Sequence, residues 1–314
     1  MHLIDTLAPI IIVIAIGVVL RARGFISAEL TRGLNKLTFW VGMPALLFVK
    51  IATAEFAPGP PLRVAGVTIA AMLVVAVLTD VVQRVLKTPS PVRGAVSQAS
   101  FRSNCVYIGL VVILYALEAS PALGLAERTA TLALGGIIPF LAISSVVVLI
   151  QHEEGASPVA AVRKTVVSAV TNPFVIACAL ATPFSLFDWP LPGFFTRSCD
   201  ALGRMALPLA LLGIGASLQL EPVKRHAVRA SVVTLLKLAL LPAVAYGVAR
   251  SFALGPVELF IVMVFCACPT AVTAYVMAEQ MDADAELSAA SIVLSTAASV
   301  VSLSLMLWWF TPAF

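Results

Sequence analysis

Charged residues are scarce in this sequence. Of its 314 residues, 11% are Asp, Glu, Lys or Arg, whereas 61% are hydrophobic. A water-exposed surface needs roughly 25% charged residues, so this composition excludes a soluble globular protein. Apolar runs of about 20 residues, the length that crosses a bilayer, recur along the whole chain with short breaks between them. The sequence therefore predicts an all-α integral membrane protein with many spans.

The residue patterns that enzyme chemistry needs are also missing. The sequence contains no Ser/His/Asp set, no zinc-ligand spacing and no phosphate-binding loop. Its five cysteines lie in or beside apolar runs and are expected to be buried thiols: Cys105, Cys178, Cys199, Cys266 and Cys268. We expect no enzyme activity, no cofactor, no resident metal and no nucleic-acid partner. Coupling to Na⁺ or H⁺ stays open.

Ten apolar segments are predicted to be transmembrane helices, separated by turns that carry proline or charge. They cover residues 5–22, 30–51, 62–84, 92–117, 127–150, 162–184, 197–218, 227–252, 256–280 and 285–310. The connections after helices 1, 3, 5 and 7 hold eleven Lys and Arg residues, and the opposite side holds five. By the positive-inside rule, both termini should lie outside the cytoplasm.

Two prolines of the first half recur in the second half at one offset. Pro9 and Pro44 correspond to Pro173 and Pro208, each 164 residues later, and the same offset places Asn104 on Cys268. Five helices per copy force the two copies into opposite membrane orientations, which is the inverted-repeat plan of many secondary transporters. The sequence thus predicts two inverted repeats, over residues 1–155 and 156–314.

Two predicted helices, the fourth and the ninth, carry interruptions. The fourth has a polar centre in its apolar span, and Pro269 removes a backbone hydrogen bond from the ninth. If both helices unwind and cross, their free N-termini would suit a carboxylate and their free carbonyls a cation. The alternative is a proline kink and a polar packing patch. The predicted substrate-binding residues are Arg102, Ser103, Asn104, Cys105, Cys268, Pro269, Thr270 and Thr273.

Charges inside membrane spans are costly and are usually paired or functional. Arg102 either neutralises a substrate anion or braces the helix in a fixed ion pair. Asp80 either pairs with Arg84 four residues on or forms a carboxylate that responds to protons or cations. Three other basic residues lie near helix ends, where they are expected to snorkel without a specific role: Lys36, Arg204 and Lys237.

The tenth predicted helix carries serines at steps of three and four, which place them on one helix face. These residues are Ser288, Ser291, Ser295, Ser299 and Ser302. Small residues in such a stripe usually permit close helix packing. The alternative is a stripe that lines a pore or an ion site.

Four blocks of sequence resemble the auxin efflux carrier family: residues 34–48, 101–104 with 108–109, 269–278, and 285–290 with 294–296. The similarity extends over nearly the whole chain and is greatest to the bacterial branch, which lacks the long cytoplasmic loop of the plant exporters. One departure is the absence of a proline shortly after Gly109. Unwinding of the fourth helix must therefore depend on Asn104 and Gly109.

The resemblance implies the fold shared with bile-acid sodium symporters. In that fold, helices 1, 2, 6 and 7 form a scaffold, and helices 3–5 and 8–10 form a mobile core in which helices 4 and 9 cross. It also implies elevator-type movement, a homodimer formed through the scaffold, and location in a bacterial inner membrane. Asp80, Gln83 and Arg84 match a motif of the plant members, whose carboxylate supports the transport site.

The predicted function is secondary transport of a small organic anion, such as a carboxylate or an amino-acid-like or auxin-like acid. One alternative is a sodium-coupled, bile-acid-like symporter, which needs a carboxylate near the second interruption. Glu279 is the nearest acid there. Another alternative is a membrane receptor that binds its ligand without moving it, which should carry a signalling domain that this sequence lacks.

Overall fold

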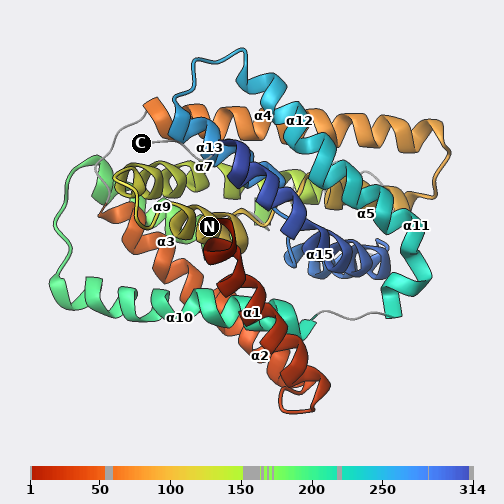
Figure 1. Cartoon of the computed structure of the whole chain (residues 1–314), viewed down its shortest axis with the longest axis horizontal. Helices are drawn as coiled ribbons and strands as arrows, with labels where there is room; N and C mark the ends of the chain where they lie inside the picture. Colours follow the sequence, from red (N-terminus) through yellow and green to blue (C-terminus); the bar gives the residue numbers. More distant parts are fainter. Residues whose placement is uncertain are drawn as a thin grey trace.

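The computed structural model describes residues 2–53, 59–150, 163, 166–167, 170–171, 173–217, 221–281 and 283–310 (Figure 1). Within these residues every named secondary-structure element is a helix, as predicted. The helices are α1 (His2–Ala22), α2 (Ala28–Leu37), α3 (Met43–Ala52), α4 (Gly59–Val85), α5 (Ser90–Phe101), α6 (Leu110–Ala116), α7 (Leu123–Ile150), α9 (Pro173–Leu186), α10 (Gly193–Ser217), α11 (Glu221–Leu235), α12 (Leu241–Ala249), α13 (Pro256–Ala267), α14 (Thr273–Gln280) and α15 (Ala285–Phe310). Three π-helical segments join some of them: η1 (Thr38–Gly42), η2 (Cys105–Gly109) and η3 (Leu236–Leu240).

Six of these helices or continuous helix pairs are long and apolar enough to cross a membrane. They are residues 28–52, α4, α7, residues 193–216 of α10, residues 222–249 and α15. Helices satisfy their backbone hydrogen bonds internally, which hydrocarbon demands. The six helices confirm the prediction of a multi-pass membrane protein. The full count of ten spans and their inverted repeat stay predictions.

Prolines explain two of the π-helical segments. Pro44 and Pro242 each follow a π-helical segment by two residues and lie at the start of the next α-helix. Proline lacks the N–H that would bond the carbonyl four residues earlier, so an inserted wider turn lets the helix continue. As a result, residues 28–52 continue through η1, and the helix after the bend at His226 continues through η3 to Ala249.

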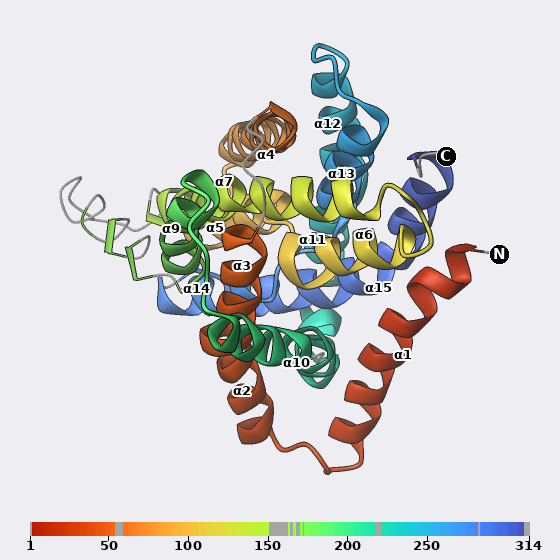
Figure 2. The ribbon, with the colours of Figure 1, turned by 90° about the vertical axis from the view of Figure 1, so that its left-hand side faces the viewer.

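The helices pack in two groups. Helices α1, α2, α3 and α9 make their main contacts with α10 or with each other. Helices α4, α5, α7 and α11 to α15 pack on one another, and the links between the groups are smaller, such as α3 on α7. Figure 2 shows α1 and α2 diverging from a tight turn, in which Gly24 takes a positive φ of 75° that glycine adopts without strain. The start of α1 and the end of α15 lie on the same side of this view.

Most helix bounds lie within a few residues of those expected, but α11 begins six residues before the expected residue 227, and two expected helices are divided. The expected helices over 92–117 and 256–280 are each divided into two, α5 with η2 and α6, and α13 with α14. The start of the expected helix over 162–184 falls largely outside the described residues, and α9 begins at Pro173.

Candidate functional site

The two divided helices are interrupted by short extended segments. Helix α5 ends at Phe101, and η2 begins at Cys105. Helix α13 ends at Ala267, and α14 begins at Thr273. At the first residue of each gap the backbone leaves the helical region, with ψ of 91° at Arg102 and 150° at Cys268.

The two extended segments meet as an isolated antiparallel bridge, which pairs Ser103 with Thr270. The backbone nitrogen of Asn104 donates to the carbonyl of Pro269 at 2.9 Å, and the nitrogen of Ala271 donates to the carbonyl of Arg102 at 3.0 Å. Each interruption therefore satisfies backbone groups that the other leaves without helical partners. We call this pair of segments, residues 102–104 and 268–272, the crossing.

Asn104 organises the start of the second half-helix. Its Oδ1 accepts a hydrogen bond from the nitrogen of Tyr107 at 3.3 Å, and its carbonyl accepts from Ile108 and Gly109. A side-chain oxygen in this position satisfies an N–H group that the helix start leaves open. Asn104 is buried, so no water can easily replace it as the cap.

Arg102 reaches away from its own helix to two others. Its Nε and Nη2 donate to Oγ1 of Thr273 at 3.2 and 3.0 Å, and its Nη1 donates to the carbonyl of Leu141 at 2.6 Å and to the hydroxyl of Ser145. The side chain is buried. All of these acceptors are neutral oxygens, and no carboxylate pairs with Arg102 among the side chains that the structure describes. Its positive charge has hydrogen-bond partners but no counter-ion there.

The sequence interpretation of Lys237 was wrong. This residue lies in η3 and is fully buried, and its Nζ donates to the carbonyl of Cys266 at 3.0 Å. It therefore does not snorkel to an interface. The sequence did contain a sign of this burial. Lys237 lies ten residues inside the predicted span 227–252, about 15 Å along a helix, which is too deep for its side chain to reach water.

Thr270 and the serine stripe hold the crossing in place. Thr270 donates from Oγ1 to the carbonyl of Ala99 at 2.8 Å, and its nitrogen donates to Oγ of Ser295 at 3.1 Å. Ser302 donates to the carbonyl of Ala267 at 3.0 Å. All five stripe serines are buried. The stripe thus combines close packing with direct support of the crossing.

Gly109 allows the two half-helices to approach each other. A Cβ atom at this position would lie 2.8 Å from Cδ1 of Phe265 and 3.1 Å from Sγ of Cys268. Cys105 also contacts this part of α13, because its Sγ donates to the carbonyl of Phe265 at 3.8 Å. All five cysteines are buried thiols, as expected. No proline follows Gly109, and its contribution to the crossing is the space that its missing side chain leaves for Phe265 and Cys268.

The residues expected to support an ion site are not all gathered at the crossing. Asp80 accepts from Nε of Arg84 at 2.6 Å, and Nε of Arg93 lies 4.0 Å from its other oxygen. Arg93 is nine residues before Arg102 on α5, about 14 Å along the helix. Gln83, three residues after Asp80 on α4, is buried. Glu279 belongs to α14, but its side chain lies outside the described part of the structure.

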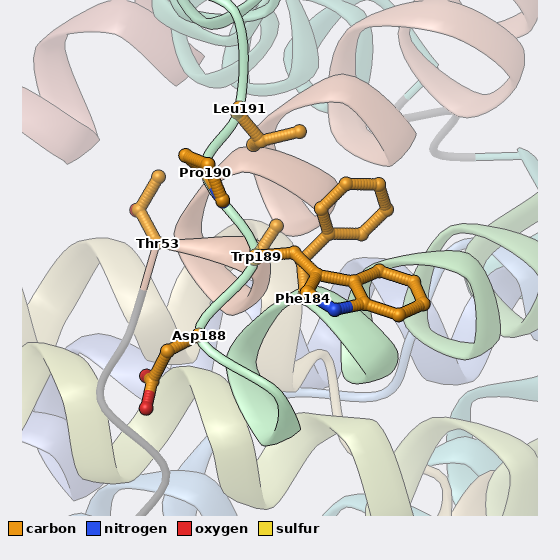
Figure 3. A pocket seen from close by; sticks show the side chains of 7 residues that line it. Thr53, Phe184, Asp188, Trp189, Pro190 and Leu191 are labelled. Carbon is orange, nitrogen blue, oxygen red and sulfur yellow. The ribbon is translucent and has the colours of Figure 1, made fainter.

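A hollow of about 240 Å³ lies elsewhere, between the end of α3 and the loop after α9 (Figure 3). Its lining includes Asp188 and the rings of Phe184 and Trp189, which pack edge to face with centroids 5.8 Å apart. None of the predicted site residues lines it. The crossing is instead built of buried side chains in direct contact.

Comparison with known proteins identifies a family and several relatives of this chain. The family of membrane transport proteins matches residues 2–156 and 128–307. A protein of Rhizobium meliloti named "Putative malonate transporter" is 29% identical over 140 residues, which cover 44% of this chain and 43% of that protein. Two uncharacterized transporters match nearly end to end. The one of Methanothermobacter thermautotrophicus is 23% identical over 96% of both chains, and the one of Methanocaldococcus jannaschii is 22% identical over 97% of both.

The family match spans nearly the whole chain, including both segments of the crossing. It agrees with the all-helical, apolar structure and with the resemblance in the sequence blocks. The chain therefore belongs to the membrane transport protein family, that of the auxin efflux carriers, and is a membrane transporter of that family.

Proposed function

We propose that this protein transports small organic carboxylates and that the crossing is its substrate site. The buried charge of Arg102 carries the proposal, because its partners Thr273, Leu141 and Ser145 are neutral. A buried cation without a counter-ion is unfavourable in an apolar surrounding. A substrate carboxylate supplies the negative charge that none of the described side chains provides, and a rearrangement of the Thr273 contact frees the guanidinium nitrogens to bind it.

The helix ends support the same class of substrate. The N-termini of the second half-helices, at Cys105 and Thr273, carry partial positive charge and meet at the crossing. The Rhizobium relative is named for malonate, a small dicarboxylate, which fits this class. Malonate is therefore the first substrate to test.

The packing of the helices supports alternating access by an elevator movement. We propose that α1, α2, α3, α9 and α10 form a fixed scaffold, which also forms the homodimer, and that the second packing group carries the crossing as a mobile core. This arrangement corresponds to ten spans in two inverted repeats with both termini outside the cytoplasm, in the inner membrane of a bacterium. The smaller links between the two groups are what sliding requires.

Counterflow of labelled malonate in proteoliposomes tests the function. Vesicles loaded with unlabelled malonate should accumulate the labelled form when they contain the protein, and empty vesicles should not. Arg102→Gln should lower this uptake by about tenfold or more, since the charge that pairs with the substrate is lost. Arg250→Gln, at an exposed arginine at the end of α12, is the matched control and should transport normally.

Asn104→Ala tests the site assignment separately, because it removes the cap at Tyr107 without changing any charge. Uptake by this variant equal to that of the unaltered protein would show that the substrate site lies elsewhere. Malonate binding in equilibrium dialysis without any counterflow would instead favour a receptor.

A further inference from the structure

We propose that Lys237 is the resident cation of the crossing, a tethered ammonium that takes the place of a bound metal ion at the end of α13. Transport then needs no sodium ion there. The transport part of this inference rests on the proposed function, whereas the binding part concerns the folded protein alone. The proposal assigns a role to the most deeply buried lysine that the structure describes.

The end of α13 is where a cation is expected. The last carbonyls of a helix lack intrahelical partners and carry partial negative charge. In transporters with broken helices, such carbonyls coordinate the coupling cation. Helix α13 ends inside the protein at Ala267, and its last residues are fully buried. Water therefore does not easily satisfy these carbonyls, and the protein or an ion must do so.

In this protein every one of the last four carbonyls of α13 already has a donor. Val264 accepts from the nitrogen of Cys268 at 3.1 Å, and Phe265 accepts from Sγ of Cys105 at 3.8 Å. Cys266 accepts from Nζ of Lys237 at 3.0 Å, and Ala267 accepts from Oγ of Ser302 at 3.0 Å. Of these four hydrogen-bond donors, Lys237 is the one that carries a positive charge. Each of these oxygens therefore already has a hydrogen-bond donor, and the ammonium supplies a positive charge at the helix end.

The charge balance of Lys237 agrees with this role. No acid pairs with it among the described side chains, and the acceptor that it has is the carbonyl of Cys266 at the helix end. A buried ammonium is costly in an apolar surrounding unless it is hydrogen-bonded and compensated. The C-terminal end of α13 provides that compensation, as a helix dipole does for cations in its last turn.

The position of Lys237 also keeps it with the crossing during movement. It lies on η3, which packs on α13, α15 and α5, all members of the group that carries the crossing. A bound sodium ion has to enter and leave in each cycle, whereas a covalently attached ammonium stays. The expected consequence is transport at the same rate in sodium and in choline media.

Two transport measurements test the proposal. Malonate counterflow by the unaltered protein should be equal in NaCl and in choline chloride. Lys237→Ala should lower it by about tenfold or more, and propylammonium, which supplies the missing side-chain atoms, should restore it about fivefold by refilling the site. The neutral 1-propanol should not restore it. Lys36→Ala, at an exposed lysine of α2, is the matched control.

A binding measurement that needs no substrate completes the test. In detergent, propylammonium chloride should raise the unfolding temperature of Lys237→Ala by several degrees more than that of the unaltered protein, because only the variant has an open ammonium site. If the protein transports no carboxylate at all, the proposed function fails but this shift remains. If Lys237→Ala does not fold, Lys237→Met keeps the apolar stem and removes only the charge.

Three results would overturn the proposal. The first is a marked loss of transport by the unaltered protein when choline replaces sodium. The second is unchanged transport by Lys237→Met. The third is equal recovery of Lys237→Ala by propylammonium and by 1-propanol, which would mean that Lys237 only fills space.

Discussion

Arg102 and Thr273 lie 171 residues apart in the chain, yet two guanidinium nitrogens of Arg102 donate to the Thr273 hydroxyl, at 3.0 and 3.2 Å. Arg102 follows the end of α5, and Thr273 begins α14. This contact joins the first break to the second half-helix of the other break. It places a buried positive charge beside a helix N-terminus, an arrangement that is itself repulsive without an anion nearby.

Gly109→Ala should destabilise the crossing by about 1–3 kcal/mol, the usual cost of overpacking a closely packed core. The new Cβ would lie 2.8 Å from the ring of Phe265, which is fully buried and cannot easily turn away. Thermal unfolding in detergent measures the effect. Gly66→Ala on α4 is the control, since nothing lies within 4 Å of its Cβ position. Equal unfolding temperatures for both variants would contradict the close approach.

Gly215→Ala should separate α1 from α10. Its Cβ would overlap the carbonyl oxygen of Ile14, and a Cβ on Gly17 would overlap the carbonyl oxygen of Leu212. Backbone cannot yield as a side chain can, so we expect a loss of about 3 kcal/mol. Gly247→Ala, with open space around it, should be neutral or stabilising in the same unfolding assay. A cost no larger than that of this control would show that the helices are not packed through these glycines.

Arg63→Ala should cost about 1–2 kcal/mol, because it leaves the buried carboxylate of Glu258 without its cation. Arg63 donates twice to Oε1 of Glu258, at 3.1 and 2.6 Å, but its own side chain is 46% exposed, which limits the energy of the pair. Adding Glu258→Gln should recover part of the loss. Lys50→Ala, which breaks the more exposed pair with Glu127, should have a smaller effect on the unfolding temperature.

Ser302→Ala should destabilise the protein by about 1–3 kcal/mol, since the buried carbonyl of Ala267 then lacks a partner. Its hydroxyl now donates to that carbonyl at 3.0 Å. Ser198→Ala, whose exposed hydroxyl bonds only within α10, is the control and should change the unfolding temperature little. If Ser302→Ala behaves like this control, the stripe on α15 serves packing alone.

The helices and the places where they break follow from local sequence. Apolar runs of membrane-spanning length predict helices, and α4 and α15 lie within three residues of their expected bounds at each end. The expected helix over 227–252 and the structure disagree more, because α11 begins at Glu221 and bends at His226. Helix ends depend on capping and packing, which single residues specify poorly.

The partners of the buried cations could not be predicted in the same way. Lys237 was expected to reach an interface, but its Nζ bonds the carbonyl of Cys266, 29 residues further on. Arg102 was expected to meet an acid or a substrate, and its acceptors are neutral oxygens on α7 and α14. Long flexible side chains can reach many acceptors, so the choice depends on which helices pack beside them.

The location in a membrane, the helical structure and the interruptions near Asn104 and Pro269 could all be predicted from the amino-acid sequence. These properties follow from hydropathy and from local backbone chemistry, which act over a few residues. The hydrogen bonds between the two interruptions, and the contact of Lys237 with the end of α13, depend instead on how the helices pack. Those contacts join segments far apart in the chain, and they form only when the helices are packed together.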